Sequence, residues 1–158
     1  MSNNNWQELF EQRRIGKGAE PDNSPMPADP SEPQEHELAP APDPQAYRPW
    51  LLQRSRSRPV MFLDLRRVEP RTGGLIGCQM GYPYLTAIDY LGDRMVSLDF
   101  GVRQFVIEGT GLDALASWLQ QGMVLAIQEY SPRIWPQTPS GPIVRVINQI
   151  NAQAASNA

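Results

Sequence analysis

The chain has 158 residues, of which 16 are proline and 12 glycine, and a formal net charge of −3, so its length allows one ordinary domain or one small domain with flexible extensions. No run of 18 apolar residues could cross a membrane, and the first residues lack the apolar core of a secretory signal. One cysteine and one histidine exclude an internal disulfide framework and a Cys/His zinc site, and a reducing, cytoplasmic location is expected.

The first expected element is a short amphipathic helical segment within residues 1–15. Asn5 stands where a helix N-cap is favoured, and Trp6, Leu9 and Phe10 fall on one face at spacing i, i+3 and i+4. About ten residues form no stable helix alone in water, so this segment needs a partner or the body of the protein. We therefore predict that these three apolar residues bind another protein, with docking onto the chain's own domain as the alternative.

Residues 16–49 are expected to form a disordered, acidic, Pro-rich linker. Nine prolines fall in this stretch, and each removes a backbone donor and disfavours helix before it. Between residues 18 and 47 there are seven acidic residues and no Lys or Arg. So few apolar residues are not expected to offset the entropy of ordering, about 1–2 kcal/mol per residue.

The next segment, residues 48–71, is basic, with seven arginines against two carboxylates. A forked guanidinium suits phosphate, and the neighbouring Tyr47 and Trp50 are suited to base stacking. Binding of anions or nucleic acid is therefore the alternative function, and the simpler explanation is a solvated edge whose charge the acidic linker counters or masks. The arginines proposed for this role are Arg54, Arg56, Arg58, Arg66 and Arg67.

Residues 50–131 are expected to be a compact α+β domain. Short apolar runs bounded by Gly and Pro indicate strands, and one apolar stripe indicates a helix at about 112–121. Short strands joined by tight turns predict a small, mainly antiparallel β-sheet with this helix packed on it. The strands are expected at residues 59–66, 75–80, 84–91, 95–100, 103–108 and 123–130.

Alternation within two of these strands predicts which side chains are buried. Val96, Leu98 and Phe100 alternate with polar residues and are expected to face the core. After a turn, Phe105 and Ile107 are expected to face the same way.

The predicted helix has Thr110 as its expected N-cap and Gly122 where a C-terminal cap belongs. Leu112, Leu115 and Leu119 form its apolar stripe, which is expected to pack on the sheet.

Residues 132–158 are expected to be a Pro-rich connection followed by a C-terminal helix or tail. Ile143, Ile147 and Ile150 recur at i, i+4 and i+7, which fits a helical stripe, whereas the propensity of Ile and Val favours a strand. The stripe could close the domain or form the seam of a homodimer.

Catalytic chemistry has little support in the residue pattern. Cys78 is the only thiol and His36 the only imidazole, and His36 lies in the expected linker. Four carboxylates on predicted strands could converge on a cation or form an acid/base pair, although such residues ordinarily keep the outer face of a sheet soluble. They are Asp64, Asp89, Asp99 and Glu108.

These patterns favour a non-enzymatic protein–protein interaction or adaptor module with a tethered recognition helix. The expected partner is another protein, with nucleic acid less favoured and no membrane contact. No catalytic residue, metal or cofactor is assigned, and a carboxylate-based enzyme is the least favoured hypothesis. Homo-oligomerisation through exposed strand edges is left open.

Overall fold

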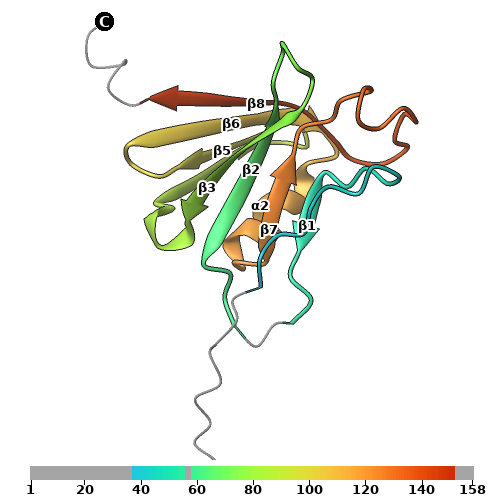
Figure 1. Ribbon diagram of the computed structural model, residues 1–158. Helices are drawn as coiled ribbons and strands as arrows, with labels where there is room; N and C mark the ends of the chain where they lie inside the picture. Colours follow the sequence, from blue (N-terminus) through green and yellow to red (C-terminus); the bar gives the residue numbers. More distant parts are fainter. Residues whose placement is uncertain (1–36, 56–57, 152–158) are drawn as a thin grey trace, which may run out of the picture. The chain divides into compact units, whose positions relative to one another are not determined.

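The computed structural model describes residues 37–55 and 58–151, all within one unit, Glu35–Ala158 (Figure 1). The predicted recognition helix, with Trp6, Leu9 and Phe10, lies outside the described residues. In chain order the elements are β1 (Trp50–Leu52), β2 (Phe62–Val68), β3 (Leu75–Gly81), the 3₁₀ turn η1 (Tyr82–Tyr84), β4 (Ala87–Leu91), β5 (Met95–Asp99), β6 (Arg103–Thr110), α2 (Asp113–Gln120), β7 (Val124–Gln128) and β8 (Ile143–Asn151).

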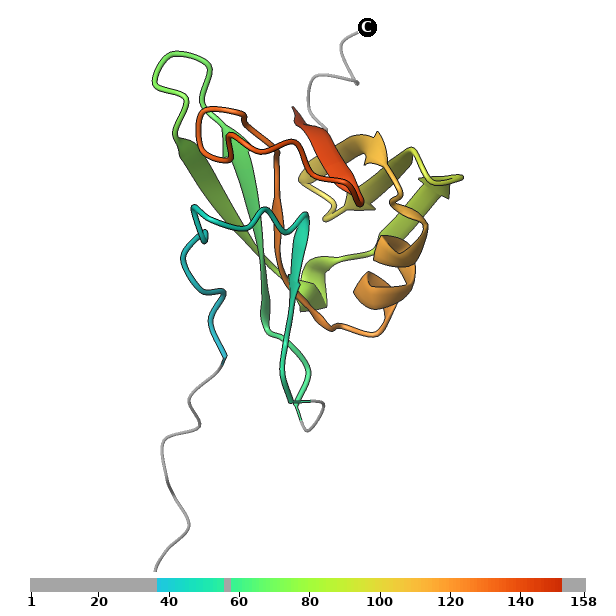
Figure 2. The same ribbon diagram turned by 90° about the vertical axis from the view of Figure 1, so that its right-hand side faces the viewer.

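The strands form two four-stranded sheets, ordered β1-β7-β2-β3 and β4-β5-β6-β8. β2 and β7 run parallel, and the other strand pairs of the described chain are antiparallel. The two sheets face each other, and the orange helix α2 lies beside the yellow-green strand β4 in Figure 2. The predicted α+β class with mainly antiparallel pairing is confirmed, although two sheets are present where one was expected.

The core fills the space between the sheets. Val96, Leu98, Phe100, Phe105 and Ile107 are all buried, as their alternation predicted. Full burial of such side chains stabilises the folded state by about 1.5–3 kcal/mol each. Further core residues come from β2, α2, β7 and β8, and they include Leu63, Leu65, Leu115, Leu119, Ile127, Val144 and Ile147.

The ends of α2 match the expectation in part. Gly122 has a positive φ of 64°, which glycine adopts without strain, and its N–H donates to the Leu119 carbonyl oxygen. The predicted N-cap, Thr110, is wrong, because Thr110 is the last residue of β6. Leu112 is at the N-cap position and makes no side-chain hydrogen bond there. Its side chain is buried in the core, and this packing rather than a polar cap stabilises the start of the helix.

The C-terminal helix fitted by the isoleucine spacing is wrong, because residues 143–151 form β8, which pairs with β6. The register shifts there: Gly109 faces Val144 and Glu108 faces Val146, leaving Arg145 as the extra residue of a bulge. Val144 and Ile147 are therefore both buried at a spacing of three. The isoleucine spacing does not mark the buried side chains, because Ile143 is half-buried and Ile150 is 42% exposed. Hydrogen bonding to β6, together with the β-propensity of Ile and Val, makes this segment a strand.

Residues 37–49, which the sequence analysis assigned to the disordered linker, are described as part of the body and contact it. The Tyr47 hydroxyl, the Pro40 carbonyl oxygen and the Asp43 carbonyl oxygen all hydrogen bond to residues of the sheets or of the 131–142 loop. We call this segment the strap. Composition alone did not reveal these contacts, because they join prolines and carbonyl groups to residues more than 20 positions away.

At the bulge, Gly109 approaches β8 so closely that no side chain fits. An ideal Cβ there would lie 1.9 Å from the Ile143 carbonyl oxygen, which is backbone and cannot swing aside. Gly109→Ala is expected to lower the free energy of unfolding by about 3 kcal/mol, the upper end of ordinary overpacking, measured by urea denaturation. The matched control is Gly141→Ala, because no atom lies within 4 Å of its added Cβ. Equal effects of the two changes would contradict the close approach.

Candidate functional site

A groove of about 770 Å³ lies between helix α2 and the strand β4, and we call it the α2–β4 groove. The helix contributes a face that combines two small residues with polar ones at its two ends: Asp113, Ala116, Ser117 and Gln120. The strand contributes Ile88 and Tyr90. The C-terminal end of β4 lies next to the start of the helix, because the N–H of Leu112 donates to the Asp93 carbonyl oxygen just beyond β4.

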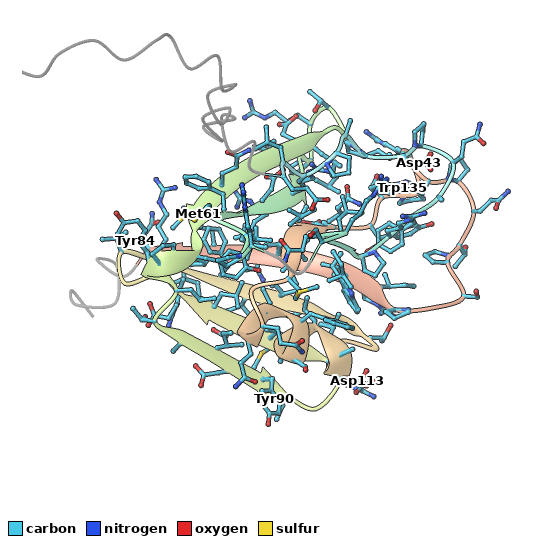
Figure 3. The ribbon with its side chains drawn as sticks, turned by 90° about the horizontal axis from the view of Figure 1, so that it is seen from below. Asp43, Met61, Tyr84, Tyr90, Asp113 and Trp135 are labelled. Carbon is cyan, nitrogen blue, oxygen red and sulfur yellow. The ribbon has the colours of Figure 1, made fainter. Side chains whose placement is uncertain are left out.

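The mouth of the groove is exposed and partly aromatic. Tyr90 is 69% exposed, and both Tyr90 and Asp113 line the groove and lie along the lower side of Figure 3. Deeper in the groove, Leu85, Ile88 and Leu119 supply apolar surface. An apolar lining with a few polar groups at the rim is typical of a binding site.

β4 is also an edge strand. It pairs with β5 on one side, and in the described part of the chain no strand pairs with its other side. It contains no Pro or Lys, the residues that commonly prevent further pairing at sheet edges. Sequence reasoning missed this site because its walls lie more than 20 residues apart in the chain and meet only in the folded protein.

The arginines predicted to bind anions differ in exposure where the structure describes them. Arg54 and Arg58 are exposed, Arg67 is half-buried, and Arg56 lies outside the described residues. Arg66 is 7% exposed and serves the protein's own groups. Its Nε donates to Asp64 Oδ2 at 2.8 Å, and its Nη1 and Nη2 donate to Gln128 Oε1 at 2.9 Å and the Pro40 carbonyl oxygen at 2.7 Å.

Besides the hydrogen bond from Arg66 to Pro40, a carboxylate of the acidic block contacts the basic block in the described residues. The Glu37 carboxylate accepts a hydrogen bond from the backbone N–H of Arg54, at 3.2 Å to Oε2. The contact uses the Arg54 backbone, so the guanidinium of this residue is not what the strap engages.

The four candidate carboxylates are divided between the two sheets. Asp64 lies in the first sheet, ion-paired with Arg66, and the other three lie in the second sheet. Asp99 accepts the N–H of Gly101, while Asp89 and Glu108 are exposed. Over residues 37–55 and 58–151, no three His, Cys, Asp or Glu side chains come close enough to hold a metal ion.

Cys78 lies half-buried on β3, where its Sγ is 3.5 Å from Nη1 of Arg103. His36, its only possible imidazole partner, lies outside the described residues. The pairing of these two residues therefore has no support in the described geometry.

An aromatic cluster anchors the strap. The Tyr47 ring makes edge contacts with Tyr130 and Trp135, at centroid distances of 5.1 and 5.0 Å. The Tyr47 hydroxyl donates to the Gln128 carbonyl oxygen and accepts the N–H of Val144. Burial raises the pKa of Tyr47 well above its usual value of 10.0, and burial raises the pKa of Tyr82 in the same way.

These raised tyrosine pKa values predict alkaline destabilisation. Above about pH 10 the unfolded chain loses phenolic protons that the folded protein keeps, so unfolding becomes more favourable as pH rises. Stability should be unaffected by these groups below pH 10 and should then fall by about 1.4 kcal/mol per pH unit for each tyrosine. Urea denaturation at several alkaline pH values measures this slope.

The slope should decrease in Tyr82→Phe, whereas Tyr84→Phe is the control, because Tyr84 is 68% exposed. A slope that persists unchanged in Tyr82→Phe would show that other groups cause it.

No protein-family model matches the chain, and no curated protein or solved structure matches it either. Among the described residues, α2 is the single α-helix, and no helix there is long and apolar enough to cross a membrane.

Proposed function

We propose that this chain is a protein–protein interaction module that binds a partner protein in the α2–β4 groove. The observation that carries the proposal is the groove itself, which joins apolar side chains and an exposed tyrosine to an edge strand with a free side. Polypeptides are recognised by this combination, since main-chain groups give affinity and side-chain pockets give specificity. The module acts by binding rather than by catalysis, in a reducing, cytoplasmic setting.

The proposal also keeps the N-terminal segment as a second binding element. Trp6, Leu9 and Phe10 have the spacing of a helix that docks its apolar face into a groove of another protein. Two binding elements on one chain make an adaptor, which can hold two partners together.

The groove is tested by filling it. Ser117 is exposed in the middle of α2 and lines the groove, so Ser117→Trp places an indole where the partner would lie. Proteins captured by the full chain from an extract and identified by mass spectrometry should include a set whose recovery falls at least about tenfold in this variant, the loss of about 1.4 kcal/mol.

Ala114→Trp is the matched control, because Ala114 is exposed on α2 and is not among the residues lining the groove. This variant should capture the same proteins as the unmodified chain. If Ser117→Trp also captures them all, the groove is not the binding site. A chain lacking residues 1–17 serves as a further arm, and it should lose a different set of proteins if the N-terminal segment binds independently.

A further inference from the structure

We infer that the occupant of the α2–β4 groove is an extended segment of another protein, which adds as a strand to the free side of β4 and directs a Lys or Arg side chain to Asp113. This inference rests on the proposed function and specifies the partner's chemistry.

The first argument is the edge itself. A strand at the edge of a sheet carries N–H and C=O groups along its free side that another chain can pair with. β4 has five residues, Ala87–Leu91, and a strand of that length spans about 17 Å. A partner segment of about five residues therefore matches the available edge.

The second argument is the space beside the edge. The helix face opposite β4 places Ala116 and Ser117 at its middle, and neither side chain extends far from the helix. α2 has eight residues and is about 12 Å long, comparable to the strand. Because α2 and β4 are in contact with each other, the added strand would lie along the free side of β4 and direct its side chains toward the small residues of α2. A bulky helix face would obstruct those side chains.

The third argument concerns the side chains of the partner. In an added strand alternate side chains point to the same face, so every second residue of the partner points toward the groove. There it meets Leu85, Ile88 and Leu119, which favour apolar side chains. Asp113 is the charged residue among those lining the groove, and it lies at the end marked by Tyr90 (Figure 3), which favours a basic side chain at that end of the partner.

The experiment uses a displayed library of random seven-residue peptides selected against the full chain, with Ser117→Trp as the counter-selection. The selected peptides should alternate apolar residues and carry Lys or Arg near one end. One peptide from this set is then synthesised in two N-methylated forms, one methylated at the odd-numbered residues and one at the even-numbered residues. One form should bind at least tenfold more weakly than the unmodified peptide, and the other should bind almost as well. The two forms differ because only alternate N–H groups of an added strand face β4 and donate to it.

The charge is tested separately. Asp113→Asn should weaken binding of the same peptide about two- to fivefold at low salt, with less effect at high salt, as expected for an exposed ion pair. The control is Asp89→Asn, because Asp89 is exposed on β4 but does not line the groove. Equal effects of the two substitutions would remove Asp113 from the proposal.

Three outcomes overturn strand addition. Peptides that lose binding in Ser117→Trp but have apolar residues at i, i+3 and i+4, and tolerate N-methylation, would make the occupant a helix and leave the proposed function standing. Failure to select any peptide sensitive to Ser117→Trp would also overturn it, and the proposed function would then fall only if the capture experiment showed no sensitive protein either. Dimerisation of the chain that Ser117→Trp abolishes, measured by sedimentation, would make the occupant a second copy.

Discussion

Arg66→Met should lower the free energy of unfolding by about 3–5 kcal/mol, the usual cost of breaking a buried ion pair by removing one partner. The side chains of Arg66 and Asp64 are 8% and 13% exposed, so the carboxylate left behind has little access to water. The change also removes the Nη1 donor of Gln128 Oε1 and the Nη2 donor of the Pro40 carbonyl oxygen. Methionine fills much of the volume, which assigns the loss to charge and hydrogen bonding rather than to a cavity.

Urea denaturation followed by tryptophan fluorescence measures this effect, and limited proteolysis reports on the strap. Because Arg66 joins the strap to the sheet, cleavage within residues 37–49 should be faster in the variant. Arg58→Met is the control, since Arg58 is exposed, and it should change stability by less than about 0.5 kcal/mol. A loss in Arg66→Met below about 1 kcal/mol would mean that Asp64 is well solvated.

Trp135→Ala should have a comparable effect, about 3–5 kcal/mol, the usual cost of truncating a large buried aromatic residue. Trp135 is 2% exposed, packs against Tyr47 and stacks near Tyr130 at a centroid distance of 6.4 Å. Its Nε1 donates to the Asp43 carbonyl oxygen at 2.7 Å, and Figure 3 shows these two residues side by side. The truncation therefore removes both the packing and the hydrogen bond that hold the strap.

Trp135→Phe separates the two contributions. It keeps a buried ring and loses the hydrogen bond, so it should cost less, with about 1 kcal/mol assigned to the bond itself. Tyr84→Ala is the control for aromatic truncation, because Tyr84 is 68% exposed, and it should have little effect. If Trp135→Phe costs as much as Trp135→Ala, the hydrogen bond rather than the packing holds the strap.

These two variants also bear on the groove. The strap lies away from α2 and β4 in the hydrogen bonds described, so loosening it should leave peptide binding in the groove intact as long as the domain stays folded. Distant sites with no shared partners usually behave independently.

Local patterns were reliable where neighbours in the sequence are also neighbours in the sheet. The hairpin of β5 and β6 pairs Val96 with Ile107 and Leu98 with Phe105, so alternation along each strand was sufficient to predict the buried face. The helix was predicted within one residue of its observed ends, 113 and 120, because its apolar stripe and Gly122 are local signals. Where pairing is remote, as for β8 with β6, the spacing of the isoleucines suggested a helix, because the local pattern does not show the partner strand.

Local periodicity was enough to predict the class of fold, the strands of the hairpins, the single described helix and the burial of their alternating apolar residues, since each depends on one continuous segment. Tertiary structure alone decided that Arg66 is internal, that residues 37–49 pack as a strap, and that β4 and α2 enclose a groove. The reason is physical: a side chain's solvation, and the free edge of a strand, depend on which distant segments pack beside it, and no local period records that choice.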